Sequence, residues 1–238
     1  MSRLPPGQRL YVVGDVHGRA DLLDELLDLI AADMERRGMA QEQRIVCLGD
    51  LIDRGPSSRA VVERVMGPMP GAATAVALLG NHERMLLDAV ADTEALEGWL
   101  VYNGGVQTLL SYDIDPPSQR ELRNGWSLAD RLPAAHLDFL GGLLLSMTVG
   151  DYFLVHAGVR PGVPFDAQSP LDLVWMREPF LSHDSSLERM VVHGHTPRAA
   201  PEIRPHRIGI DTGAWFSGRL TALVLEGEAR AFLHTGKQ

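Results

Sequence analysis

Short apolar runs alternate with amphipathic segments along the first third of the chain. Residues 9–13, 44–48 and 74–79 each predict a short buried strand, and each is followed by a polar, glycine-containing turn and a helical pattern. The clearest helix is predicted over residues 20–37, because its leucines recur at the i, i+3, i+4 spacing of one face and Gly38 follows as a stop. This alternation predicts an α/β fold whose strand-to-helix turns lie at one edge of a sheet.

The rest of the chain changes character after the third predicted strand. A second helix is predicted over residues 57–66, between the second and third predicted strands. After the third strand, residues 94–145 are helical and irregular, with turns at 103–105 and 115–117. Further strands are predicted, in chain order, at residues 152–155, 190–192, 207–210, 220–225 and 229–233. No repeat or low-complexity linker interrupts this pattern. We therefore expect one domain over residues 1–238, with residues 94–145 as a helical cap or insertion.

Composition and charge narrow the class of protein. The chain has 238 residues, of which 45% are hydrophobic, and this is enough to build a core and argues against a disordered chain. Its single cysteine, Cys47, excludes an intrachain disulfide and a CxxC zinc site, and we expect it to be a buried strand residue. The formal net charge of −9 and the lack of a basic stripe argue against a nucleic-acid partner.

A membrane-spanning segment is not expected. The most apolar stretch, residues 137–149, is shorter than the ~18 residues that a spanning helix needs. Residues 1–14 lack the arrangement of a signal peptide. We therefore expect a cytoplasmic protein without a membrane partner, whose oligomeric state the sequence leaves open.

The loops that follow the predicted strands carry the candidate chemistry, because each contains carboxylate, imidazole or carboxamide groups. In chain order they are residues 14–18 (Gly-Asp-Val-His-Gly), 49–55 (Gly-Asp-Leu-Ile-Asp-Arg-Gly), 80–83 (Gly-Asn-His-Glu), 156–158 (His-Ala-Gly) and 193–195 (His-Gly-His). Ligand sites of open α/β sheets form at the edge where such strands end. We therefore expect these side chains to meet in one site.

The donor types in these loops indicate a metal site. Oxygen and nitrogen ligands without a thiolate suit divalent manganese, iron or zinc. The candidate ligands are Asp15, His17, Asp50, Asn81, His156 and His195. They are too many for a single catalytic metal that keeps an open position. They fit two metals that share one carboxylate, an arrangement typical of in-line displacement at phosphorus.

These motifs, in this order, resemble those of the calcineurin-like binuclear metallophosphoesterases. Within that family the chain is most similar to the phosphoprotein phosphatase branch in its small bacterial and phage form. Residues 99–105, 174–178 (Val-Trp-Met-Arg-Glu) and 210–214 (Ile-Asp-Thr-Gly-Ala) also resemble that form. The resemblance spans residues 11–225 and implies a β-sandwich flanked by helices, with a helical insertion.

The resemblance also implies a role for each site residue. Asp15 and His17 would bind the first metal, Asp50 would bridge both, and Asn81, His156 and His195 would hold the second. His82 would be the general acid, oriented by Asp53, and Arg54 and Arg177 would clamp the phosphate oxygens. The nucleophile would be a hydroxide that bridges the two metals. Manganese is the expected metal, with iron or zinc as alternatives.

Other polar residues near these motifs have simpler interpretations. His193 competes with His195 for one ligand role, and the family places the ligand after the glycine, so His195 is preferred and His193 is expected to pack behind it. Glu83 is expected to cap or orient rather than to catalyse. The other histidines are expected to be structural and without partners: His136, His183, His206 and His234.

The favoured function is a metal-dependent serine/threonine-type protein phosphatase that acts on a phosphoprotein or a small phosphorylated substrate. The alternative is a dinucleoside (diadenosine) tetraphosphatase, which shares nearly the whole scaffold. Asp53 and Glu83 favour the phosphatase, because the symmetrical tetraphosphatases typically change both positions. A non-catalytic metal-binding module is disfavoured by the complete ligand set, and a nuclease is disfavoured by the negative net charge.

Overall fold

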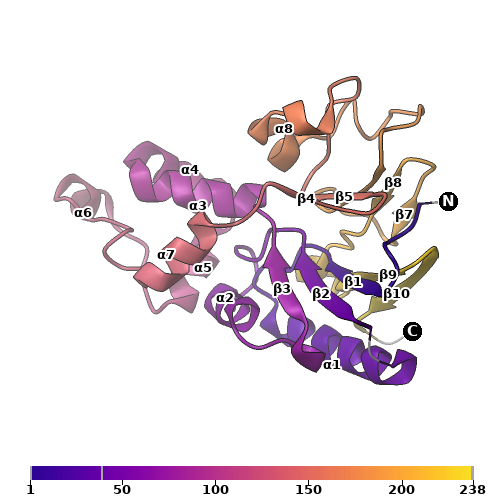
Figure 1. Cartoon of the computed structure of the whole chain (residues 1–238). Coiled ribbons are helices and arrows are strands. Elements are labelled where there is room, and N and C mark those ends of the chain that lie inside the picture. The colour runs from indigo at the N-terminus through magenta and orange to yellow at the C-terminus, as the bar shows by residue number, and fades with distance from the viewer. Residues whose placement is uncertain (1, 39, 237–238) are drawn as a thin grey trace.

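Two five-stranded mixed sheets form the centre of the protein in the computed structural model, which describes residues 2–38 and 40–236 (Figure 1). The first sheet has the order β10 (Ala229–His234), β9 (Thr221–Glu226), β1 (Gln8–Val13), β2 (Glu42–Cys47) and β3 (Thr74–Ala77). β1, β2 and β3 are parallel, whereas β9 and β10 are antiparallel to their neighbours. The carboxyl ends of β1, β2 and β3 therefore meet at one edge.

The second sheet repeats this mixed arrangement. Its order is β4 (Ser146–Val149), β5 (Tyr152–Val155), β6 (Met190–His193), β8 (Arg207–Gly209) and β7 (Glu202–Ile203). β5, β6 and β8 are parallel, and the two edge strands are antiparallel to them. The ends of β5 and β6 lead into the fourth and fifth polar loops of the sequence.

Helices connect and cover the sheets. They are α1 (Ala20–Arg37), α2 (Ser58–Met66), α3 (Asn81–Ala91), α4 (Thr93–Tyr102), α5 (Gly105–Ser111), α6 (Gln119–Arg123), α7 (Ala134–Gly141), α8 (Pro170–Trp175) and α9 (Ala214–Ser217), with short 3₁₀ turns at Pro70–Ala72 and Phe165–Ala167. Among the described residues, none of these helices has both the length and the apolar character needed to cross a membrane.

The side chains of β1 alternate between its two faces, and each face packs against a different layer of the protein. On β1, Leu10 and Val12 pack with Leu154 and Val192 of the second sheet, so one apolar layer lies between the sheets. The intervening residues of β1 face the opposite way and pack with the leucines of α1. Because both faces are covered, β1 is buried along almost its whole length. The predicted β-sandwich flanked by helices is thus confirmed.

Most predicted elements are confirmed at or near their expected ends. The predicted helix 20–37 is α1, and Gly38 follows it with φ 76°. Cys47 is a buried residue of β2, as expected. The edge strands β4 and β7 were not predicted, because each is too short or too polar to give a hydrophobic period. Hydrogen bonding to a neighbouring strand, rather than local sequence, defines them.

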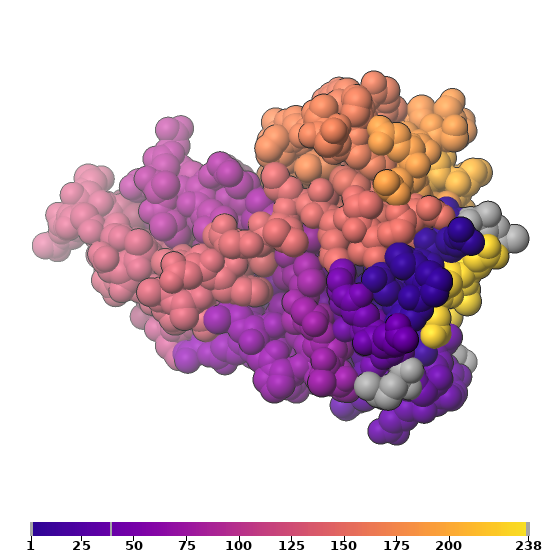
Figure 2. All heavy atoms as spheres, viewed as in Figure 1, coloured from indigo at the N-terminus to yellow at the C-terminus, as the bar shows by residue number. Residues whose placement is uncertain are grey.

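The segment from α4 to α7 is the predicted helical insertion. It projects from the two sheets, and the magenta and pink atoms of Figure 2 stand out from the rest of the molecule. α4 packs against α3, and α5 packs against both α4 and α2. The base of the insertion therefore lies beside the two helices that follow β2 and β3.

Candidate metal centre

The strand ends bring the predicted ligands together. Asp15 and His17 follow β1, Asp50 follows β2, and Asn81 begins α3 after β3. His156 and His195 come from the loops after β5 and β6 of the second sheet. All six side chains are buried. The meeting of the two sheets at this edge thus makes a compact set of oxygen and nitrogen donors.

One group of three contains Asp50, His156 and His195, whose potential ligand atoms all lie within 4.8 Å of one another. His156 Nε2 is 3.4 Å from Asp50 Oδ1. The side-chain oxygen of Asn81 lies 3.0 Å from His156 Nε2 and 2.8 Å from His195 Nδ1. These four residues are the predicted second metal site together with its bridging carboxylate.

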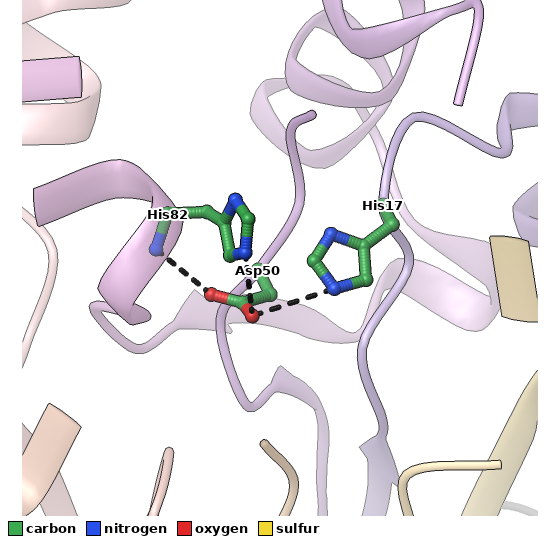
Figure 3. Close-up of side chains that lie close together, drawn as sticks. All are labelled: His17, Asp50 and His82. Carbon is green, nitrogen blue, oxygen red and sulfur yellow. Dashed lines mark hydrogen bonds and ion pairs between the residues drawn. The ribbon is translucent and has the colours of Figure 1, made fainter. Parts of the chain in front are cut away.

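The other group of three contains His17, Asp50 and His82 (Figure 3). His17 Nε2 is 3.5 Å from Asp50 Oδ2, and His82 Nε2 is 3.9 Å from the same oxygen. Asp15, the predicted partner of His17, is outside both groups of three, and its carboxylate accepts a hydrogen bond from the backbone N–H of His195 at 3.0 Å. The structure therefore groups His82, rather than Asp15, with His17 and Asp50.

The histidines fit a metal because their lone pairs are directed into the site. His17 Nδ1 donates to the carbonyl of Ile52, and His156 Nδ1 donates to the carbonyl of Leu48, so Nε2 of each ring faces Asp50. Burial lowers the pKa of His17 and of His195 to about 3, which keeps both rings in the neutral form that binds metals. His195 Nε2 is buried and has no hydrogen-bond partner among the residues that the structure describes.

The carboxylates also fit a site built for cations. Asp15, Asp50 and Asp211 are buried near one another, and within residues 2–38 and 40–236 no arginine forms an ion pair with any of them. Burial, together with repulsion from Asp211 and Asp50, raises the pKa of Asp15. Buried like charges are costly unless a cation offsets them, so divalent ions suit this cluster. Asp211 had no predicted role, although it belongs to the Asp-Thr-Gly motif and follows the strand predicted at residues 207–210.

Backbone strain is concentrated in the same loops. Seven non-glycine residues among those described have positive φ, and five of them belong to the site: His17 (46°), Asp50 (50°), Asp53 (71°), Arg54 (67°) and His195 (62°). Such conformations cost free energy and persist only where the surroundings impose them. Two glycines allow close approach, because a Cβ on Gly194 would lie 2.0 Å from Asp15 Oδ1 and one on Gly80 would lie 2.2 Å from Asp50 Oδ1.

Glu83 holds the loop that carries Asp50. Its fully buried carboxylate accepts hydrogen bonds from the backbone N–H groups of Asp50 (2.8 Å), Leu51 (2.7 Å) and Gly80 (3.0 Å). These bonds tie the loop after β2 to the start of α3. The expectation that Glu83 orients is confirmed.

A buried pair lies beside the ligands. His82 Nδ1 is 2.7 Å from Asp53 Oδ2, so the bond to Asp53 fixes the ring and leaves Nε2 facing the site. Burial alone would lower the pKa of His82, but the charges of Asp50 and Asp53 outweigh it and raise the pKa above its ordinary value. The pair therefore favours the protonated form of His82, the form that a proton donor needs.

Arginine side chains face the same site. Arg54 places Nη1 3.0 Å from His17 Nε2 and Nη2 3.0 Å from His82 Nε2, and its guanidinium lies 5.6 Å from the ring centroid of Trp215. Arg177 is exposed and close enough to His156 to lower the pKa of that ring, after the larger effect of burial. Arg54 thus contacts two of the predicted site residues directly, and Arg177 acts on His156 through its charge.

His193 points away from the ligands. Its Nδ1 donates to the carbonyl of Gly194, and Arg207 lies 3.3 Å from its Nε2, so it packs behind the loop as expected. The expectation that the other histidines lack partners is wrong for His136, whose Nδ1 lies 2.9 Å from the hydroxyl of Tyr112. A residue 24 positions away supplied that contact, so local sequence could not indicate it.

Comparison with known proteins places this site in a family. Residues 8–220 match the calcineurin-like phosphoesterases. The chain is 30% identical to serine/threonine-protein phosphatase 1 of Salmonella typhimurium over 90% of each protein. It is 32% identical to a symmetrical bis(5′-nucleosyl)-tetraphosphatase of Dechloromonas aromatica over 63% of this chain, which corresponds to 44% of that relative.

A solved structure described provisionally as a diadenosine tetraphosphatase has the same fold. Its TM-score is 0.68 at 23% identity, and the comparison covers 100% of both chains. The family match covers most of this chain, and the site contains the buried donors that metal-dependent phosphoester hydrolysis requires. The chain belongs to the calcineurin-like phosphoesterases, a family of metal-dependent hydrolases.

Proposed function

We propose that this phosphoesterase is a serine/threonine-type protein phosphatase. The observation that supports this choice is the buried 2.7 Å hydrogen bond between His82 and Asp53, which prepares a proton donor. A proton donor matters most where the leaving oxygen is strongly basic, as is the alkoxide of serine or threonine. It matters less for an anhydride, whose leaving group is a weakly basic phosphate.

The predicted ligands would hold two divalent ions. Asp15, His17 and Asp50 would hold one, and Asn81, His156 and His195, with Asp50 as the bridge, would hold the other. When bound, such ions act as Lewis acids that neutralise phosphoryl oxygens and activate water. We propose manganese, with iron and zinc as alternatives that the same nitrogen and oxygen donors accept.

The remaining side chains would bind the phosphate and move the proton. Arg54 brings Nη1 to His17 Nε2 and Nη2 to His82 Nε2, each at 3.0 Å, and this fork would bind two phosphate oxygens, with Arg177 adding a second positive charge. As the bond from phosphorus to the leaving oxygen breaks, His82 Nε2 would give its proton to that oxygen. Asp53 would stabilise the ring in the required orientation.

A dinucleoside tetraphosphatase is the second candidate, because relatives with that name share much of this chain. Two residues weigh against it. Asp53 orients His82, and Glu83 fixes the loop of Asp50, so both positions that the symmetrical tetraphosphatases typically change have a physical task in this protein. These contacts favour the hydrolysis of phosphomonoesters.

Side-by-side hydrolysis with added manganese tests the proposal. The substrates are a phosphoserine peptide, a phosphotyrosine peptide and diadenosine tetraphosphate, and the controls are metal-stripped protein and His82→Ala. We expect faster turnover of the phosphoserine peptide, lost in both controls. Preferential cleavage of the dinucleotide would contradict the proposed substrate but not the proposed metal site. Hydrolysis of the peptides by the metal-stripped protein would overturn the metal assignment.

A further inference from the structure

The carboxylate of Asp53 is held by more than His82. Oδ2 accepts hydrogen bonds from His82 Nδ1 and from the indole N–H of Trp99, each at 2.7 Å, and Oδ1 accepts one from the hydroxyl of Thr108 at 2.6 Å. All four side chains are at most 1% exposed. Trp99 belongs to α4 and Thr108 to α5, so two of the three donors come from the helical insertion.

The number of available protons fixes the direction of each hydrogen bond in this network. The one hydroxyl proton of Thr108 goes to Asp53, so in the 2.9 Å contact between Ser58 and Thr108 the donor is Ser58. The backbone N–H of Asp53 points at the hydroxyl oxygens of both Ser58 and Thr108, each 3.0 Å away. The carboxylate and the backbone of Asp53 are therefore both fixed, although its φ of 71° is unfavourable.

The turn between α4 and α5 contacts the neighbouring residue as well. The carbonyl of Gly104 accepts a hydrogen bond from the backbone N–H of Arg54 at 3.3 Å. Gly104 has φ 83°, and a Cβ there would lie 2.7 Å from Arg54 N. A Cβ on Gly105 would lie 2.5 Å from the ring of Trp99. The two adjacent glycines thus let the insertion reach the loop of Asp53 and Arg54.

We infer that the α4–α5 part of the insertion positions the proton donor: Trp99 and Thr108 orient Asp53, and Asp53 orients His82. This inference rests on the proposed role of His82 as the general acid. Trp99 and Thr108 are positioning residues, because neither reaches the metal ligands or the mouth of the site. The insertion therefore has a part in the reaction in addition to any part in substrate binding.

Removal of one donor should affect only reactions that need the proton. Without the indole N–H, the carboxylate can rotate, and His82 loses the orientation that aims Nε2 at the leaving oxygen. An alkyl phosphate such as phosphoserine needs that proton, whereas p-nitrophenyl phosphate has a good leaving group and needs it little. A general loss of structure would slow both substrates equally.

The test compares Trp99→Phe and Thr108→Val with the unchanged protein on both substrates. We expect kcat for the phosphoserine peptide to fall by about 10- to 100-fold, and kcat for p-nitrophenyl phosphate by less than about threefold. KM and the bound metal content should not change. Thr108→Ser keeps the hydroxyl and should retain most of the activity that Thr108→Val loses. Trp126→Phe, in the same insertion, is the matched control and should behave as the unchanged protein.

The outcomes separate this inference from the function on which it rests. His82→Ala should also lower kcat more for the phosphoserine peptide than for p-nitrophenyl phosphate. The difference between the two substrates should be larger than for Trp99→Phe or Thr108→Val. If His82→Ala slows both substrates alike, the general acid itself is wrong, and the inference fails with it. If His82→Ala discriminates but Trp99→Phe and Thr108→Val do not, the positioning role alone is overturned. Equal rates for Thr108→Ser and Thr108→Val would also overturn it.

Discussion

Replacement of Arg54 by lysine separates the charge of this side chain from its geometry. In the structure, Nη1 of Arg54 lies 3.0 Å from His17 Nε2 and Nη2 lies 3.0 Å from His82 Nε2, and in the proposed function both nitrogens would bind phosphate oxygens. Lysine keeps the positive charge but has one nitrogen and no planar fork. Arg54→Lys should therefore weaken substrate binding and catalysis without changing the metal content.

The size of this effect follows from the contacts that are lost. One charge-assisted hydrogen bond contributes about 1.5–3 kcal/mol, and the contact of the guanidinium with Trp215 adds about 0.5 kcal/mol at an exposed position. Because Arg54 is exposed, the lower value of about 1.5 kcal/mol applies to the hydrogen bond. Together with the contact with Trp215, the loss is about 2 kcal/mol. This corresponds to a fall of about thirtyfold in kcat/KM.

The assay is steady-state hydrolysis of a phosphoserine peptide, with inorganic phosphate as a competitive inhibitor. Arg84→Lys is the matched control, because Arg84 is an exposed arginine of α3 paired with Asp88 outside the ligand set. The inhibition constant of phosphate should rise for Arg54→Lys and stay constant for Arg84→Lys. If both variants have the same kcat/KM and the same inhibition constant, the reasoning about the fork is refuted.

Three further changes test other parts of the structure. Asp50→Asn should reduce the content of both metals, measured by atomic absorption, and two retained metals with full activity would contradict a bridging role. Arg177→Ala should weaken inhibition by phosphate, and an unchanged constant would make Arg177 an ordinary surface residue. The hydrogen bond from Arg9 lowers the pKa of Glu226 in the folded protein. The pair therefore stabilises the fold above the ordinary pKa of glutamate, and this stabilisation is lost as the pH falls through the pKa of Glu226 in the folded protein. Glu226→Gln should cost at most about 1 kcal/mol in urea unfolding at pH 7, and a cost that persists at pH 2 would contradict the ion pair.

Regular elements and ligand loops could be predicted because their signals are local. The leucines of α1 repeat at the helical period, and Gly38 ends the helix where the chain needs φ 76°. The gathering of the polar loops followed from the rule that ligands collect where parallel strands end, but the expectation of one sheet edge is wrong, because His156 and His195 follow strands of the second sheet. The donor types and the number of candidate ligands led to the prediction of two metals, and the structure contains two groups of three residues that could hold a metal ion.

Residues that act through distant contacts could not be predicted in this way. Trp99 and Thr108 lie 46 and 55 positions from Asp53, and although residues 99–105 resemble the family, nothing local indicates a contact with Asp53. Asp211 follows β8 of the second sheet, and its charge acts on Asp15, which follows β1 of the first sheet. Their roles depend on tertiary packing, and the periodicity of hydrophobic residues in the sequence does not indicate such contacts.

Strain and support in the site are linked. The loops with Asp50 and Asp53 adopt left-handed conformations that cost about 1–2 kcal/mol per residue, so an isolated loop would relax away from this shape. Two buried carboxylates oppose the relaxation: Glu83 binds the backbone of the Asp50 loop, and Asp53 is fixed by Trp99 and Thr108. Glu83 lies in α3, and Trp99 and Thr108 lie in the insertion, so these three side chains support the loop from outside it. Loss of either support should therefore disturb the orientation of the site before it unfolds the sheets, because the apolar layer between the sheets does not depend on those contacts.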